Sequence, residues 1–258
     1  MRDCLVELGC PREKVLVQRL GVDVEHLPFS PRYPDADGTI RILASASFRE
    51  KKDLPSAVRA FIAVKKAHPD LELRLTILVD ARPDPAEQAI KSEIRALVKD
   101  AALTESITLR GYQPHEVFRQ ELQRHHLFIH PSVTAANGDS EGGAPVSIIE
   151  ATASGMPVIS TRHCDIPGVV SDGENGLLVD ERDLGGLTDA LENLVMDPEK
   201  WPAMGAAGRE IAQRDFDAAK QVRRLEHIYD AIRDGVTPGN FEGSPPSILS
   251  RESRGRYA

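Results

Sequence analysis

The spacing of hydrophobic positions changes along the chain. Short runs rich in β-branched and other apolar residues alternate with longer stretches in which apolar positions recur at helical spacing. The short runs predict strands at 40–44, 71–79, 107–109, 127–129, 158–160 and 177–179. The longer stretches predict helices at 53–68, 83–98, 117–122, 145–154, 184–196, 199–212 and 218–232.

This alternation of strands and helices predicts an α/β fold. Right-handed βαβ units at this rhythm build a doubly wound, Rossmann-like parallel sheet with helices on both faces. Such sheets bind ligands beyond the carboxyl ends of their strands, often at the N-terminus of a helix. We therefore expect the chemistry in the loops that follow the strands.

Composition and charge narrow the class of protein. The chain has 258 residues, with 32 Lys and Arg against 40 Asp and Glu, for a net charge of −8. This acidic balance argues against nucleic acid as the main partner. The sequence shows no signal-peptide pattern and no apolar run near the ~20 residues of a transmembrane helix. The cysteines Cys4, Cys10 and Cys164 are too few for a disulfide framework and predict reduced thiols in a cytoplasmic protein.

The segment 137–150 is the most informative part of the sequence. Gly142 and Gly143 allow backbone N–H groups to approach a ligand closely, and Pro145 suits the first turn of the helix that follows. The N–H groups at a helix start, together with the helix dipole, favour an anion. The segment therefore predicts a loop that binds phosphate.

Two carboxylates flank this loop. Glu141 precedes it, and Glu150 lies in the following helix among apolar residues. A buried carboxylate needs hydrogen-bond donors, and a vicinal diol supplies two. The residues by themselves do not decide between this interpretation and a simpler one. In the simpler one, Glu150 is a solvated helix residue and Glu141 is an ordinary loop charge.

Residues 137–161 and 164–179 resemble the donor-binding half of glycosyltransferase family 4. The likeness rests on the glutamate pair, the run EATASGMPV at 150–158 and the run DGENGLLV at 172–179. It extends over roughly residues 5–234. The resemblance implies a retaining, metal-independent enzyme of the GT-B architecture. Such an enzyme moves a hexosyl group from a nucleotide-diphosphate sugar to an acceptor hydroxyl, with no cofactor.

The resemblance also implies roles for the residues of the loop. Glu150 would bind the nucleotide ribose, and Glu141 would contact the donor sugar as the catalytic residue. The loop residues Gly142, Gly143 and Ala144 would meet the diphosphate and the sugar. The family usually has seven residues between its two glutamates, whereas eight separate them here, which places the extra residue in this loop.

The family also carries an Arg and a Lys, five residues apart, that bind the diphosphate. Lys52 matches the Lys, but Ser47 occupies the Arg position. Arg49, two residues further on, is the candidate replacement. Tyr112 lies in the turn after the strand at 107–109. In the family this turn borders the nucleobase, so the resemblance implies that Tyr112 packs against the base.

The resemblance further predicts the organisation of the chain. We expect residues 1–35 to be the remnant of a preceding domain with its crossover, 36–236 to be the donor-binding domain, and 237–258 to be a disordered tail. We expect the acceptor domain of the family to be absent, so that 15–17 would be a strand without its parent sheet and residues before about Ser30 would be poorly ordered or dock irregularly. The chain would then self-associate or need a partner chain that carries the acceptor domain, in the cytoplasm or at the inner membrane surface.

Two alternative functions stay open. One is an enzyme like the nucleotide-sugar 2-epimerases, which share the GT-B architecture, and the other is a non-catalytic fragment that binds a sugar nucleotide.

His125, His126 and His130 bracket the strand at 127–129, but neighbouring side chains on a strand point apart and no carboxylate pattern completes a site. We therefore expect no metal.

Overall fold

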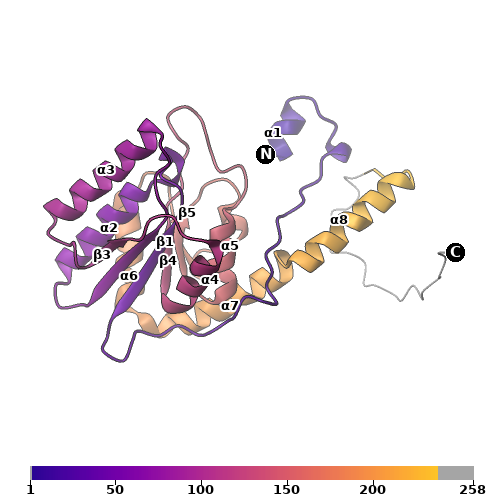
Figure 1. Ribbon diagram of the computed structural model, residues 1–258. Coiled ribbons are helices and arrows are strands. Elements are labelled where there is room, and N and C mark those ends of the chain that lie inside the picture. Colours follow the sequence, from indigo (N-terminus) through magenta and orange to yellow (C-terminus); the bar gives the residue numbers. More distant parts are fainter. Residues whose placement is uncertain (1, 238–258) are drawn as a thin grey trace. The chain divides into compact units, whose positions relative to one another are not determined.

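The computed structural model describes residues 2–237 and contains a parallel sheet that confirms the predicted fold (Figure 1). Its six strands lie in the order β3-β2-β1-β4-β5-β6. They are β1 Ile40–Ser45, β2 Leu73–Leu78, β3 Ile107–Leu109, β4 Leu127–His130, β5 Val158–Thr161 and β6 Gly176–Val179. All neighbouring strands pair in parallel. Of the tail predicted at 237–258, residues 238–258 lie outside the described residues.

Helices cover both faces of the sheet (Figure 1). They are α2 Leu54–Ala67, α3 Pro85–Asp100, α4 His115–Arg124, α5 Val146–Ser154, α6 Leu184–Met196 and α7 Trp201–Asp215. Successive side chains of β1 lie on opposite faces of the sheet and belong to two hydrophobic clusters. Ile42 belongs to the cluster with α2, α3 and α6, whereas Leu43 belongs to the cluster with α4, α5 and α7. Among residues 2–237, no helix is both long and apolar enough to cross a membrane.

The chain divides into two compact units. Residues 22–217 form the unit with the sheet, and the other unit comprises 2–21 and 218–237 of the described chain, with α1 Arg2–Glu7 and α8 Ala218–Arg233. Residues 15–17, expected to be a strand without its parent sheet, pair with no strand in any described part of the chain. The backbone at Val15 is extended, and the carbonyl of Val17 accepts a hydrogen bond from the Arg224 side chain at 2.9 Å.

The expectation that residues before about Ser30 are poorly ordered or dock irregularly is wrong for the part that begins at residue 22. Val22, Val24 and Leu27 are buried in the cluster that contains α5 and α7. The guanidinium of Arg209 in α7 donates to the carbonyls of Val24 and Leu27, each at 2.9 Å. The segment 22–30 is therefore an integral part of the sheet unit.

Gly155 ends α5 and lets the segment 22–30 pass close by. Its φ is +92°, in the left-handed region that glycine adopts without strain. A Cβ atom at this position would lie 2.8 Å from both the ring of Phe29 and the carbonyl of Ser30. The helix stop read from the sequence is therefore confirmed, and the close contact is a second reason for glycine.

Candidate functional site

The predicted site lies where the chain connections reverse direction in the sheet. β1 and β4 are neighbours, but the chain continues from β1 toward β2 and from β4 toward β5. Their following loops, 46–53 and 131–145, therefore lie at the switch point of the carboxyl edge, which is where open α/β sheets bind ligands. Loop 46–53 contains the short 3₁₀ helix η2, Glu50–Lys52.

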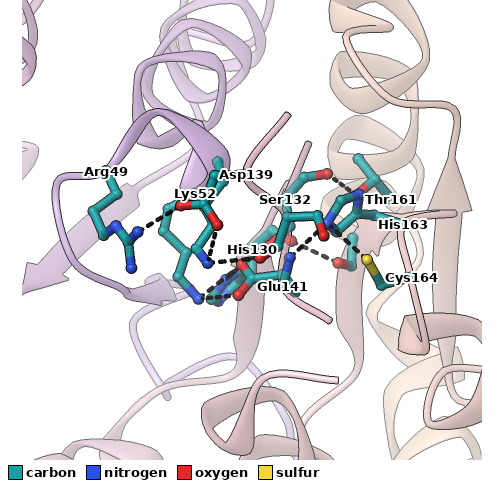
Figure 2. Close-up of polar contacts among 12 residues, drawn as sticks. Arg49, Lys52, His130, Ser132, Asp139, Glu141, Thr161, His163 and Cys164 are labelled. Carbon is teal, nitrogen blue, oxygen red and sulfur yellow. Dashed lines mark hydrogen bonds and ion pairs between the residues drawn. The ribbon is translucent and has the colours of Figure 1, made fainter. Parts of the chain in front are cut away.

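Lys52 and Glu141 form a buried ion pair between these loops (Figure 2). The ammonium lies 2.7 Å from the carboxylate, and the two side chains are 15% and 7% exposed. The hydroxyl of Ser132, just after β4, donates to the same carboxylate at 2.8 Å. The loops are also joined through the backbone, because the N–H of Val133 donates to the carbonyl of Lys51 at 2.9 Å. The pair is thus fixed from both sides.

The surroundings of Glu141 keep its carboxyl group ionised. Burial raises its pKa, but the imidazole of His130, the Lys52 ammonium and the Ser132 hydroxyl outweigh burial and lower the pKa to about 2. His130 is buried, and its Nε2 lies 3.8 Å from the carboxylate, beyond hydrogen-bond distance. Burial lowers the pKa of His130, so the imidazole acts as a neutral dipole. Burial also lowers the pKa of Lys52, although Glu141 opposes that shift.

His163, which follows β5, fixes the backbone at Glu141 (Figure 2). Its Nε2 accepts the Glu141 backbone N–H at 3.1 Å, so the ring hydrogen lies on Nδ1, which donates to Glu181 at 2.6 Å. Cys164 Sγ lies 3.2 Å from the same Nε2. The loop after β4 is therefore anchored to the loop after β5.

A second group of charges lies beside the buried pair. Arg49 and Lys51 both bind the carboxylate of Asp139, at 2.5 Å and 3.0 Å. Lys51 also donates to the carbonyl of Ser140 at 2.6 Å. We call the five charged residues Arg49, Lys51, Lys52, Asp139 and Glu141 the loop cluster. In it, all three cations of the loop after β1 are paired with carboxylates of the loop after β4.

The glycine loop leads from the loop cluster into α5. Gly142 has a φ of +75°, and a Cβ atom at Gly143 would meet no described atom within 4 Å, so the backbone is open to a ligand there. Ala144 is buried. Pro145 precedes the helix, and no side chain of the described residues caps it. The first N–H groups of α5 are therefore available to an anion.

An open cavity of about 360 Å³ lies on the β1–β3 side of this helix start. We call it the Glu150 cavity. Val146 and Ser147, the first residues of α5, line it together with Tyr112, which is 81% exposed. Glu150 is buried at its wall and is paired with His115 at 2.9 Å. Burial raises the pKa of Glu150, although His115 opposes the shift.

The structure brings most of the predicted site residues together in two adjoining places. The loop cluster contains Lys52, Arg49 and Glu141, and the Glu150 cavity contains Glu150 and Tyr112. The glycine loop connects the two places, since Ala144 and Pro145 lead into α5. Ser47 is half-buried in the loop after β1 and makes no side-chain hydrogen bond to the described residues.

Sequence reasoning missed four residues of this site. Lys51 and Asp139 complete the loop cluster, His163 holds the backbone of Glu141, and His115 pairs with Glu150. Each lies in a loop after a strand, or in the first turn of a helix that follows such a loop. Their position after a strand indicates that they lie near the carboxyl edge of the sheet. It does not indicate which of these side chains contact one another.

Metal binding finds no support in the side chains of the described region. Within residues 2–237, no group of three or more His, Cys, Asp or Glu side chains is arranged to hold a metal ion. His125 Nδ1 instead contacts the carbonyl of Glu121 at 2.8 Å, and His126 stacks on Trp201. The cysteines are free thiols.

Comparison with known proteins identifies the class to which this fold and site belong. The profile of the family described as "Glycosyl transferases group 1" matches residues 39–197, which include both loops, the glycine loop and Glu150. The match covers more than half of the chain. The chain therefore belongs to the group 1 glycosyl transferases, and the resemblance seen in the sequence is confirmed at the level of the family.

Particular relatives agree with this assignment. WcaL of Escherichia coli K12, described provisionally as a colanic acid biosynthesis glycosyltransferase, is 33% identical over 88% of this chain and 54% of its own length. The amylovoran biosynthesis glycosyltransferase AmsK of Erwinia amylovora is 30% identical over 88% of this chain and 53% of its own length. The chain thus spans about half the length of these curated relatives.

The fold also aligns with solved structures. The structure of Anabaena Alr3699/HepE in complex with UDP superposes with a TM-score of 0.76 at 17% identity, over 89% of this chain and 61% of that one. At this identity the likeness establishes the fold, a Rossmann-like domain of the kind found in GT-B glycosyltransferases.

Proposed function

We propose that this chain supplies the donor-binding half of a retaining glycosyltransferase that transfers a hexosyl group from a nucleotide-diphosphate sugar to an acceptor hydroxyl. The observation that carries this proposal is the two-part site at the carboxyl edge of the sheet. A cavity with a buried carboxylate adjoins a cluster of cations, and the uncapped start of α5 lies between them. A nucleoside joined to a diphosphate has the same order of chemical groups.

In this proposal Glu150 binds the ribose. Its buried carboxylate has one side-chain partner, His115, within the described chain, and a carboxylate accepts several hydrogen bonds. The two ribose hydroxyls would supply donors that relieve the cost of its burial. Tyr112, exposed at the rim of the same cavity, would pack against the base.

The diphosphate would lie over the glycine loop. Lys52 and Arg49 provide positive charge from the loop after β1, with Ser47 beside them in the same loop. The backbone at Gly142 and Gly143 and the first N–H groups of α5 complete the surroundings. When the bond to the sugar breaks, negative charge grows on the diphosphate, and groups already oriented toward it lower the barrier.

Glu141 would face the donor sugar beyond the diphosphate. Its carboxylate is ionised and held by Lys52 and Ser132, so it can accept hydrogen bonds from sugar hydroxyls without needing to move. This arrangement orients the sugar for transfer, which is the catalytic role proposed for Glu141.

The acceptor half of the reaction would come from elsewhere. Because the chain spans about half the length of its relatives, we propose that an acceptor-binding domain outside the given sequence completes the cleft, either within a longer chain or on a partner chain. The isolated chain would then bind donor but transfer no sugar. A cytoplasmic location, or one at the inner membrane surface, stays a prediction.

Calorimetry on the full chain tests this proposal. UDP is the first probe, since it is the nucleotide in the structure of HepE, followed by GDP, ADP and the corresponding monophosphates. We expect one nucleoside diphosphate to bind, more tightly than its monophosphate and equally well in EDTA, because the proposed site uses protein cations. Binding of none of these nucleotides would overturn the proposal. Sugar transfer by the monomeric chain would refute the half-enzyme part of it.

A further inference from the structure

Asp139 holds two cations that face the proposed diphosphate site. Its carboxylate binds the guanidinium of Arg49 through one oxygen and the ammonium of Lys51 through the other (Figure 2 shows the Arg49 contact). Lys51 is close to the buried Lys52 in sequence and is itself only 12% exposed. The contacts also lower the pKa of the Asp139 carboxyl, Lys51 contributing most, so the group is an anion at neutral pH.

The backbone of this loop is held by contacts that do not involve the Asp139 carboxylate. The backbone of Asp139 is held at both ends, since its N–H donates to the Asn137 side chain at 2.9 Å and its carbonyl accepts from Ala135 at 2.9 Å. The N–H of Ala136 donates to the Glu50 carboxylate at 2.9 Å. The Asp139 carboxylate is 35% exposed and can therefore be displaced while the loop keeps its shape.

A carboxylate and a phosphate present the same kind of anionic oxygen to Arg and Lys. We propose that Asp139 is a built-in competitor of the donor diphosphate: it occupies Arg49 and Lys51 in the free protein and gives them up when the diphosphate binds. Lys51, which the family comparison did not single out, thereby becomes a diphosphate ligand. This inference rests on the proposed function of the site.

The test measures binding of UDP and of inorganic pyrophosphate to the full chain and to Asp139→Asn. Since the Asp139 carboxylate is partly exposed, its ion pairs are weak, and because two of them are released, the variant should bind both ligands roughly 2- to 10-fold more tightly. Glu93→Gln is the matched control, because Glu93 binds Arg59 at the same 2.5 Å with similar exposure, on helices α2 and α3. It should leave both affinities unchanged.

The cations that carry the effect are tested by removing them. In an Arg49→Gln/Lys51→Gln background, adding Asp139→Asn should give no gain in affinity. A gain in that background would overturn the inference, as would an equal or weaker affinity of the Asp139→Asn single variant, which would make Asp139 a structural anchor.

Comparing the unmodified chain with Asp139→Asn keeps the two proposals distinguishable. If the unmodified chain binds UDP and Asp139→Asn binds no better, the competitor inference fails and the proposed function stands. If only Asp139→Asn binds these ligands, the proposed function and the competitor inference are both supported, because Asp139 then blocks binding in the unmodified chain. If neither chain binds either ligand, both fail.

Discussion

The loop cluster and the Glu150 cavity each contain a buried glutamate, but their surroundings shift the carboxyl pKa in opposite directions. Glu141 is surrounded by donors that outweigh its burial and lower its pKa to about 2, whereas burial dominates at Glu150 and raises its pKa. The first carboxylate is already satisfied within the protein. The second has His115 as its one side-chain partner within the described residues, and it is therefore the one that gains most from the hydroxyls of a ligand.

The largest effect should come from removing the partner of the satisfied carboxylate. Lys52→Met leaves Glu141 buried without its cation, and breaking a buried pair from one side costs about 3–5 kcal/mol of unfolding free energy. Urea unfolding measures this loss. Lys91→Met is the matched control: Lys91 is 16% exposed, close to the 15% of Lys52, but its partner Asp80 is 38% exposed. That variant should lose less than about 1 kcal/mol.

A second variant separates the lost charge pair from a lost side chain. Lys52→Met/Glu141→Gln removes the unpaired charge and should recover most of the stability. If the double variant is as unstable as Lys52→Met, the buried charge of Glu141 is not the cause.

The two carboxylates should also give opposite dependences of stability on pH. Glu141 has a folded-state pKa of about 2 against an ordinary 4.5, so its contribution is fully present above pH 4.5 and is lost as the pH falls toward 2. At 1.36 kcal/mol per pKa unit this is about 3 kcal/mol. The raised pKa of Glu150 acts in the opposite sense, adding stability below pH 4.5 that is lost as the pH rises through the folded-state value.

Unfolding curves recorded across this acid range check both signs. Glu141→Gln should flatten the loss of stability toward pH 2, and Glu150→Gln should remove the gain at low pH. A Glu141→Gln profile parallel to that of the unmodified chain would contradict the account of the loop cluster.

The next effect concerns binding in the Glu150 cavity. Glu150→Gln should weaken UDP binding roughly 10- to 100-fold, the worth of a hydrogen bond to a charged group. The stability of the free chain at neutral pH should not fall, because the amide carries no buried charge. Glu116→Gln, at an exposed position in the first turn of α4, is the control. Unchanged affinity in Glu150→Gln would remove Glu150 from the site.

The smallest effect is expected at Arg49. Its side chain is 44% exposed and already bound to Asp139, so Arg49→Ala should weaken pyrophosphate binding only roughly 2- to 5-fold. Lys52→Ala should weaken it more. A larger loss for Arg49→Ala would show that Arg49 is the main diphosphate ligand and that the alignment on Lys52 is wrong.

Much of the fold could be predicted from the sequence, because buried strands and amphipathic helices leave local patterns. The strand at 107–109 and the end of α5 before Gly155 were read from such patterns. The apolar run at 15–17 has the same local pattern, but a strand also needs a neighbouring strand. The docking of 22–30 was missed because Val22, Val24 and Leu27 follow no regular period.

The candidate site was predictable only in part, for a related reason. Glu150 and the glycine loop lie within one continuous segment, so their spacing carried the information. Ser132 and His163 meet Glu141 from the ends of β4 and β5, and Lys51 meets Asp139 across 88 residues of sequence. Which loop side chains meet depends on how the loops leave the sheet, and the residue pattern does not record that.

The most direct test asks whether the site has two parts. Calorimetry with UDP, uridine and pyrophosphate compares the unmodified chain, Glu150→Gln and the folded double variant Lys52→Met/Glu141→Gln. The account predicts that Glu150→Gln weakens UDP and uridine but leaves pyrophosphate unchanged, whereas the double variant weakens UDP and pyrophosphate but leaves uridine unchanged. If both variants weaken the same ligands, or neither weakens any, the division between the loop cluster and the Glu150 cavity is contradicted.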